Sequence, residues 1–137
     1  MSVTIKAGTF LIDLKTKKVA LVYRERQKDF SFPKGHLEKN ETIKECAIRE
    51  TEEETKTIAK IVDSIEPVVD SYVTPSGENC ECYMYVATSG GKSDNSSLDT
   101  HETLWISFDE VEEKLSYDSL KKVWNKVKFE IEKLLTK

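Results

Sequence analysis

The sequence predicts a mixed α/β fold (α+β, with one mixed sheet), in which parallel and antiparallel strands pack against helices. Strand-like and helix-like segments follow one another without the strict strand–helix–strand alternation of a wholly parallel sheet. The chain opens with two strand-like runs joined by a short polar turn, which is typical of an antiparallel hairpin. With 137 residues, no internal repeat and no linker-like segment, it is predicted to form a single domain over residues 1–137.

The predicted hairpin occupies the N-terminal part of the chain. Thr4–Asp13 is rich in β-branched and apolar residues, and Val19–Tyr23 is a short apolar run, so both are predicted strands. Lys15–Lys17 is the predicted turn between them.

Thr42–Thr55 is the first predicted helix, and Asn40 or Glu41 can cap its N-terminus. Residues three and four apart share a helix face. Ile48 and Thr51 are predicted to lie opposite the apolar face, so we expect both sides of this helix to be covered. The apolar face itself, suited to packing on a sheet, consists of Ile43, Cys46 and Ala47.

Further strands are predicted in the middle of the chain. Ala59–Val69 holds one or two strands, interrupted near Pro67 because proline donates no ladder hydrogen bond. Pro75–Asn79 is a predicted turn, and Cys80–Ala87 alternates in the manner of a strand with two distinct faces. Ser89–Thr100 is the longest predicted loop.

The C-terminal part is predicted to contain a strand and two helices. Leu104–Ser107 is the strand, and Ser107 can cap a short helix over Phe108–Leu115. Asp118–Leu135 is the final helix, with an apolar stripe on one face. The stripe, predicted to pack in the core, is Leu120, Val123, Trp124, Val127, Ile131 and Leu134.

The composition narrows the class of protein. The net charge is −4, from 21 basic and 25 acidic side chains, which argues against general nucleic-acid binding. No apolar run reaches the roughly 20 residues of a membrane span, and the N-terminus lacks the apolar segment of a signal peptide. Three cysteines are too few for a disulfide framework, so cytoplasmic residence is expected, with Cys80 and Cys82 packed in the interior.

Three glutamates gather at the end of the first predicted helix. Helical spacing brings Glu50, Glu53 and Glu54 to one side of one turn, where each like-charged pair costs about 0.2–0.5 kcal/mol. A hard divalent cation such as Mg²⁺ would offset that repulsion, since it prefers carboxylate oxygens. The alternative is a solvated acidic helix face.

The spacing of this region favours the metal site. Six residues stand in fixed register: Gly35, Glu41, Arg49, Glu50, Glu53 and Glu54. This register, within Gly35–Thr57, resembles the signature box of the MutT-like Nudix hydrolases, which cleave nucleoside diphosphates linked to another moiety. The resemblance implies an α/β/α sandwich with the sheet between helices.

The resemblance also implies roles for the charged residues. Glu50 and Glu54 would be ligands of Mg²⁺ (or Mn²⁺), with Glu53 a further ligand or the base that acts on water. A backbone carbonyl at Lys34 or Gly35 would complete the ligand set, and glycine permits backbone geometry that other residues cannot reach.

Arg49 belongs to the implied catalytic set together with Glu50 and Glu53. On a helix it is predicted to point about a quarter turn away from the three carboxylates. By resemblance it would pair with Glu41 and tie the loop to the helix. The alternative is an exposed ion pair with Glu45 or Glu53.

Two positions depart from the family pattern. Lys56 replaces a usual glycine and Thr57 replaces a bulky aliphatic residue. Glycine suits a helix C-terminus that turns left-handed, where a lysine costs roughly 1 kcal/mol. We expect a strained or re-routed helix exit that removes no carboxylate.

Basic residues just before the box are candidates for binding substrate phosphates, and we expect at least one of them to do so. Pro33–His36 is similar to the corresponding segment of family members that act on dinucleoside polyphosphates and diphosphoinositol polyphosphates. His36 either binds phosphate or hydrogen-bonds within its loop. The basic candidates are Arg24, Arg26, Lys28 and Lys34.

Two later residues are further candidates. Tyr72 resembles a downstream tyrosine of diadenosine tetraphosphate hydrolases and would stack on adenine, unless it is an ordinary strand aromatic. Glu102 would supply an additional carboxylate at the metals, unless it is an ordinary residue of a strand edge, and His101 has weaker support.

The sequence therefore predicts a Mg²⁺-dependent pyrophosphohydrolase of small nucleotides, dinucleoside polyphosphates first. Alternative substrates are oxidised nucleoside triphosphates, ADP-ribose, RNA 5′ ends and diphosphoinositol phosphates. The alternative class is a Nudix-like domain that senses a nucleotide without cleaving it. The pattern is compatible with either a monomer or a homodimer.

Overall fold

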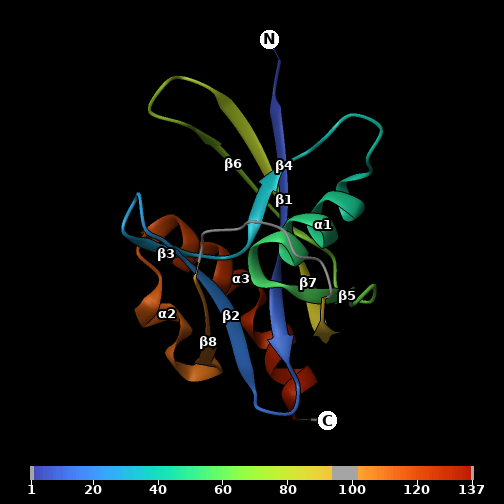
Figure 1. Ribbon diagram of the computed structural model, residues 1–137. Coiled ribbons are helices and arrows are strands. Elements are labelled where there is room, and N and C mark those ends of the chain that lie inside the picture. Colours follow the sequence, from blue (N-terminus) through green and yellow to red (C-terminus); the bar gives the residue numbers. More distant parts are fainter. Residues whose placement is uncertain (1, 94–101, 137) are drawn as a thin grey trace.

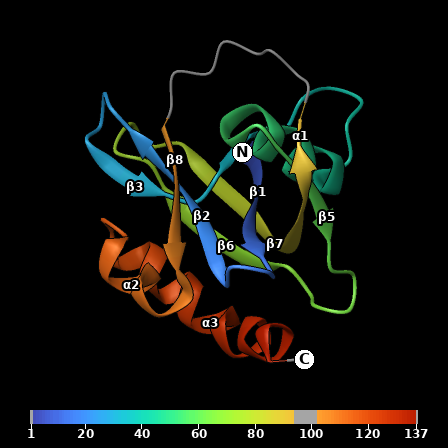
Figure 2. The ribbon, with the colours of Figure 1, turned by 60° about the horizontal axis from the view of Figure 1, so that its bottom comes forward.

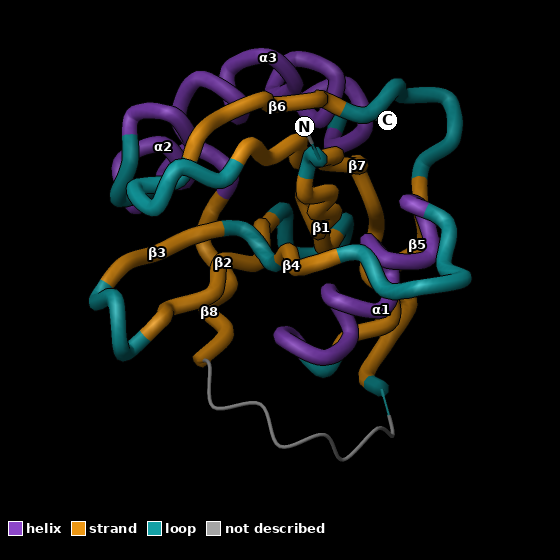
Figure 3. The backbone as a smooth tube through the Cα atoms, turned by 90° about the horizontal axis from the view of Figure 1, so that it is seen from above, coloured by secondary structure: helices purple, strands orange, loops and turns teal. Residues whose placement is uncertain are grey.

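The computed structural model describes residues 2–93 and 102–136, which form a sheet between two layers of helices (Figure 1). Helix α1 (Ile43–Thr55) covers one face, and α2 (Val111–Lys114) and α3 (Asp118–Leu135) lie on the other (Figures 2 and 3). The predicted mixed sheet and α/β/α sandwich are confirmed. Within the described residues, no helix is long and apolar enough to cross a bilayer.

The predicted N-terminal hairpin is present. Strand β1 (Thr4–Asp13) pairs antiparallel with β2 (Lys18–Arg24), with Ile12 opposite Val19. Successive residues of β1 point to opposite faces of the sheet: Phe10 joins the cluster packed with α3, and Ala7 joins the cluster packed with α1. Strand β1 therefore lies between both helix layers.

Strand β7 (Asn79–Lys92) makes the sheet mixed, because it runs parallel to β1 from Thr4 opposite Cys80 to Ile12 opposite Thr88. On its other edge it pairs antiparallel with β6 (Val68–Val73) and then with β5 (Thr57–Ile61). The predicted break near Pro67 thus separates two strands.

The prediction of a loop from Ser89 was wrong at its start. The strand continues to Lys92, because Ser89 and Lys92 pair with Ala59 and Thr57 of β5. The rest of that loop, from Asp94 onward, lies outside the described residues. Strand β8 (Glu102–Ser107) pairs with β2.

Two short strands were not predicted. Strand β3 (Asp29–Ser31) pairs with β2, and β4 (Lys34–His36) pairs with β1. Each has three residues, too few to show a periodic pattern. They lead the chain from the β1–β2 hairpin to the loop before α1.

Helix α1 begins differently from the prediction. Its N-cap is Thr42, whose Oγ1 accepts from the Glu45 N–H at 3.0 Å, while Glu45 Oε1 accepts from the Thr42 N–H at 2.8 Å. This reciprocal capping box satisfies two backbone donors. The prediction that Asn40 or Glu41 caps the helix was therefore wrong. Asn40 lies in the loop with φ 67°, and the Glu41 carboxylate accepts from Arg49.

Thr51 was also misplaced. It is fully buried, and its Oγ1 lies 2.8 Å from Oγ1 of Thr9 on β1. Thr51 follows Ala47 by four residues, so both lie on the sheet-facing side of the helix. Ile48 is only partly buried.

The apolar stripe of α3 packs in the core as predicted. Trp124 lies at its centre, with ring centroids 5.9 Å from Phe32 and 5.5 Å from Phe108. Ser107 makes no capping hydrogen bond; a 3₁₀ turn over Phe108–Glu110 precedes α2 instead. The buried stripe residues are Leu120, Val123, Trp124, Val127 and Ile131, with Leu134 packed at the edge.

Lys56 ends α1 in the left-handed conformation, with φ 56° and ψ 34°, and its N–H donates to the Glu52 carbonyl at 2.8 Å. The helix exit is therefore left-handed, as the family glycine would allow, and it is not re-routed. Strand β5 starts at the next residue, Thr57.

Lys56→Gly is expected to raise the free energy of unfolding by about 1 kcal/mol, because glycine adopts the left-handed conformation without the steric cost of a Cβ. Chemical denaturation followed by circular dichroism measures this. Lys60→Gly, in strand β5, is the matched control and is expected to lower the free energy of unfolding by about 0.5–1 kcal/mol. Equal effects of the two substitutions would contradict the interpretation.

Candidate active site

Two cavities open between α1, the sheet and the start of α3. The first, about 290 Å³, contains Glu50 and Glu54 in its wall, and we call it the carboxylate cavity. The second, about 580 Å³, contains Tyr72 and Tyr117, and we call it the aromatic cavity. The two adjoin, because four residues line both of them: Lys6, Arg24, Ser31 and Lys34.

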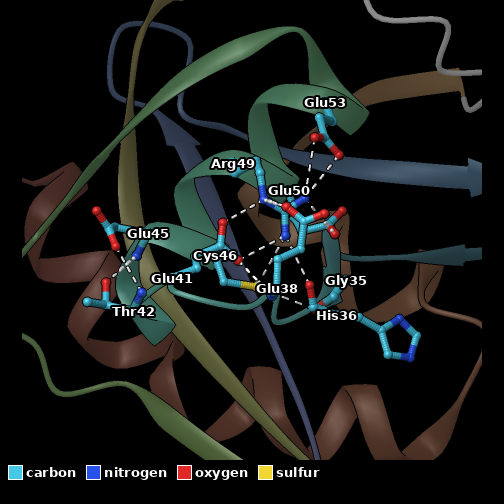
Figure 4. A network of polar contacts seen from close by, with 10 residues as sticks. All are labelled: Gly35, His36, Glu38, Glu41, Thr42, Glu45, Cys46, Arg49, Glu50 and Glu53. Atoms are coloured by element: carbon cyan, nitrogen blue, oxygen red, sulfur yellow. Dashed lines mark hydrogen bonds and ion pairs between the residues drawn. The ribbon is translucent and has the colours of Figure 1, made fainter.

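Arg49 lies at the centre of the polar network beside the carboxylate cavity (Figure 4). Its Nε donates to Glu41 at 2.6 Å, and its Nη2 donates to Glu41 and to the His36 carbonyl, both at 3.0 Å. Its Nη1 donates to Glu50 at 3.1 Å and to Glu53 at 3.3 Å.

The pairing of Arg49 with Glu41 is thus confirmed. The prediction that Arg49 points away from the carboxylates was wrong, because its long side chain reaches Glu50 and Glu53 as well as Glu41. One guanidinium can serve all three, since it has five N–H donors in a rigid fork.

The network shifts the acidity of its members. Arg49 lowers the pKa of Glu41 to about 2, chiefly by hydrogen bonding to the carboxylate. Burial raises the pKa of Glu50, and the charge of Arg49 opposes that change. The half-buried Glu50 carboxylate is therefore a site where added positive charge would be stabilising.

Gly35 provides the space for that carboxylate. A Cβ built on Gly35 would lie 2.1 Å from Cδ of Glu50, so any side chain at this position would force the Glu50 carboxylate to move. Gly35 does not have a positive φ, unlike Gly77 and Gly91, so the prediction that unusual backbone geometry demands glycine here was wrong. The close approach of the Glu50 carboxylate is the reason that glycine suits this position.

The three glutamates occupy different positions. Glu50 and Glu54 line the carboxylate cavity, and Glu54 Oε1 accepts from the Lys34 N–H at 3.1 Å. Glu53 is not among the described residues that line the two cavities. It forms an ion pair with Arg49, and its side chain is 41% exposed. Glu50 thus lies with Glu53 at Nη1 of Arg49 and with Glu54 in the wall of the carboxylate cavity.

The oxygen atoms at this site are of the type that a hard cation binds. Mg²⁺ prefers carboxylate and carbonyl oxygens and keeps several waters, so one or two carboxylates suffice. Two carboxylates line one cavity here, beside Gly35. Within the described parts of the chain, no three histidine, cysteine or acidic side chains already converge as a closed ligand set. The residues at this site are of the kind that would hold a divalent cation together with water and substrate.

The basic candidates divide into two groups. Arg24 and Lys34 line both cavities, whereas Arg26 and Lys28 are exposed in the loop after β2. Burial lowers the pKa of Lys34. Lys6 also lines both cavities, although it was not among the candidates predicted from the sequence. A single lysine within an otherwise apolar strand is the feature that could have indicated it.

The remaining candidates lie at different places relative to the two cavities. His36 lines the carboxylate cavity, and half-buried Tyr72 lines the aromatic cavity with Lys6 Nζ 5.6 Å from its ring centroid. Glu102 is exposed at the start of β8 and is absent from the described lining of both cavities. Its neighbour Thr103 donates to the Glu54 carbonyl at 3.1 Å. His101 lies outside the described residues.

Comparison with known proteins identifies the family. The NUDIX domain model matches residues 4–126, so the chain belongs to the NUDIX family. A relative named 8-oxo-(d)GTP phosphatase, from Mycolicibacterium smegmatis (strain ATCC 700084 / mc(2)155), is 33% identical over 109 residues. The match covers 79% of this chain and 33% of the relative, so the chain spans about a third of that protein's length.

Solved structures agree with the fold. A NUDIX hydrolase from Nitrosomonas europaea superposes with a TM-score of 0.76 at 19% identity, covering 96% of this chain and 91% of its own. The MutT protein from Bacillus halodurans gives 0.70 at 22% identity, covering 91% and 82%. A NUDIX-family hydrolase from Clostridium perfringens gives 0.73 at 18% identity, covering 95% and 97%.

The ion pair of Glu41 with Arg49 predicts a pH dependence of stability. A pKa lowered from 4.5 to about 2 means that the ionised carboxylate stabilises the fold above pH 4.5, and that this stabilisation is lost as the pH falls toward 2. Glu41→Gln is therefore expected to be less stable than wild type at pH 7, with the difference narrowing between pH 4.5 and 2. Denaturation curves at a series of pH values measure it. A difference independent of pH would contradict the assignment.

The contact between Gly35 and Glu50 predicts a paired effect on stability. Gly35→Ala is expected to lower the free energy of unfolding by about 1–3 kcal/mol, as overpacking does. In a Glu50→Ala background the same substitution should cost less, because the carboxylate that would clash is gone. Thermal or chemical denaturation of the four proteins tests this, and an equal cost in both backgrounds would show that Glu50 is not the obstacle.

Proposed function

We propose that this protein is a divalent-metal-dependent pyrophosphohydrolase of nucleotides. The observation that carries the proposal is the carboxylate cavity, which is lined by Glu50 and Glu54 together with Lys6, Arg24 and Lys34. Membership of the NUDIX family and the name of the Mycolicibacterium relative support it. A cavity with acidic and basic walls suits a phosphate chain bound together with a cation.

Mg²⁺ is the proposed cofactor, with Mn²⁺ as the alternative, held by Glu50 and Glu54 with the Gly35 carbonyl or Glu53. When bound, such an ion neutralises phosphate charge and activates water. Hydrolysis forms a bond from the water oxygen to phosphorus and breaks the bridging P–O bond. A Glu53 carboxylate oxygen is the proposed acceptor of the water's proton. Arg49 holds Glu50 and Glu53 in place.

The basic wall is proposed to hold the phosphate chain. Arg24 and Lys34 reach both cavities, so a chain bound between them would carry its nucleoside into the aromatic cavity. His36 is proposed to contact the phosphates from the rim, and Tyr72 to contact the base. Glu102 is proposed to supply an additional carboxylate at the metal site, because its neighbour Thr103 donates to the Glu54 carbonyl.

The first proposed substrate is an oxidised guanine nucleoside triphosphate. The relative is named for 8-oxo-(d)GTP. Asp70 of β6 lines the aromatic cavity and is partly buried, and within the described parts of the chain no hydrogen bond reaches its carboxylate. A carboxylate can accept from both N–H donors on the Watson–Crick edge of guanine, whereas adenine offers one amino group and an acceptor there.

Dinucleoside polyphosphates are the second candidate. The aromatic cavity, at about 580 Å³, contains two tyrosines, Tyr72 and Tyr117, that could hold a base between them. The similarity of Pro33–His36 to enzymes of that class also supports it.

The test is a cleavage assay with Mg²⁺ on 8-oxo-dGTP, dGTP, diadenosine tetraphosphate, ADP-ribose and a diphosphoinositol phosphate, in which chromatography separates the products from the substrate. We expect selective cleavage of one class. Glu50→Gln and Glu54→Gln should each lower kcat at least about 100-fold, because a metal supplies several kcal/mol and each 1.4 kcal/mol is tenfold in rate. Glu53→Gln is expected to do the same.

Glu113→Gln, on the exposed side of α2, is the matched control and should leave kcat unchanged. Preference for 8-oxo-dGTP would support the first substrate and preference for diadenosine tetraphosphate the second. Binding without cleavage of any compound would overturn the proposal in favour of a nucleotide-sensing domain.

A further inference from the structure

A second arginine network lies where the two cavities meet. Arg24, the last residue of β2, is in direct register with Asp29, the first residue of β3. The loop between them closes tightly, with Lys28 at φ 56° and its N–H donating to the Arg24 carbonyl at 2.6 Å. Because paired residues of adjacent strands project to the same face, both side chains lie together.

The contact between the two side chains is bidentate. Arg24 Nε donates to Asp29 Oδ1 at 2.7 Å, and Nη2 donates to Oδ2 at 2.6 Å. The Asp29 side chain is only 3% exposed, whereas that of Arg24 is 32% exposed. A fork-to-fork pair of this kind fixes the plane of the guanidinium as well as its position.

Tyr117 completes the network from the other end of the chain. Its hydroxyl donates to Asp29 Oδ2 at 2.6 Å. The neighbouring Ser116 binds β3 directly, since its Oγ accepts from the Phe30 N–H at 2.8 Å. The Tyr117 carbonyl accepts from the Leu120 N–H in the first turn of α3, so its backbone is also held.

The charges agree with this geometry. Hydrogen bonding to Arg24 holds the pKa of Asp29 below its usual range, and Asp29 raises the pKa of Arg24. Asp29 thus accepts from three donors as an ionised group. Of the five N–H bonds of Arg24, two point to Asp29, and in the described residues no other hydrogen bond from the guanidinium is present.

We propose that Asp29 and Tyr117 are positioning residues that hold Arg24 at the junction of the two cavities, where its remaining N–H groups bind the phosphate chain of a nucleotide. The proposal rests on the proposed function for the nature of the ligand. Tyr117 also lines the aromatic cavity, so the residue that contacts the nucleoside end is tied to the residue that contacts the phosphates.

The competing explanation is that the network only joins β3 to α3. In that case its removal would lower stability and leave nucleotide affinity unchanged. An effect transmitted through Arg24 has a different signature: it disappears when Arg24 is absent.

The experiment measures binding of α,β-methylene-GTP by calorimetry with Mg²⁺, together with KM and kcat for 8-oxo-dGTP. Because hydrogen bonds to a charged group are strong, we expect Asp29→Asn to raise Kd and KM about tenfold and Tyr117→Phe about threefold, with kcat within about twofold of wild type. In an Arg24→Ala background, Asp29→Asn should change Kd by less than about twofold.

Asp63→Asn is the matched control, because it breaks the exposed Lys44–Asp63 ion pair of 2.7 Å, whose residues are not among the described lining of either cavity, and it should leave Kd unchanged. If Asp29→Asn and Tyr117→Phe bind as wild type does, or if Asp29→Asn weakens binding equally without Arg24, the proposal is overturned. Should Asp29→Asn fail to fold, Tyr117→Phe decides the outcome. Failure of wild type to bind or cleave any nucleotide would instead overturn the proposed function.

Discussion

The guanidinium of Arg49 joins the loop and the helix that build the carboxylate site. It binds the His36 carbonyl at the end of β4, Glu41 on the loop before α1, and Glu50 and Glu53 on α1 itself. Like-charged pairs on one helix face repel by about 0.2–0.5 kcal/mol each, and this arginine offsets that repulsion. This ion-pair network therefore fixes Glu50 relative to strand β4, whereas Glu54 accepts directly from the Lys34 N–H of that strand.

Charges of opposite sign line the carboxylate cavity. Glu50 and Glu54 come from α1, whereas Lys6, Arg24 and Lys34 come from β1, β2 and β4. The helix is held on the sheet by small buried side chains, which permits a close approach of the two walls. A phosphate chain with a divalent cation complements such a pair of walls, since the cation meets the carboxylates and the phosphate oxygens meet the basic side chains.

Much of the fold could be predicted from local patterns. The bounds of Thr4–Asp13 and Asp118–Leu135 match the observed elements. The first is a run rich in β-branched and apolar residues, and the second has an apolar stripe with helical periodicity. Of the two expected outcomes at Lys56, a strained or a re-routed helix exit, the structure has the left-handed exit without re-routing. The errors fall where tertiary contacts decide: Thr51 is buried against Thr9, and β7 extends to Lys92 through pairing with β5.

The sequence by itself determined the elements of the site: a helix that ends in three glutamates, a glycine and an arginine in fixed register with them, and basic residues before it. Tertiary structure alone decided which of these residues face a cavity, because Glu50 and Glu54 turn toward the sheet while Glu53 is held by Arg49. It also brought Tyr117 to Asp29, 88 positions apart in the chain. Contacts of that separation leave no local periodicity, so they become visible only when the strands and helices are packed together.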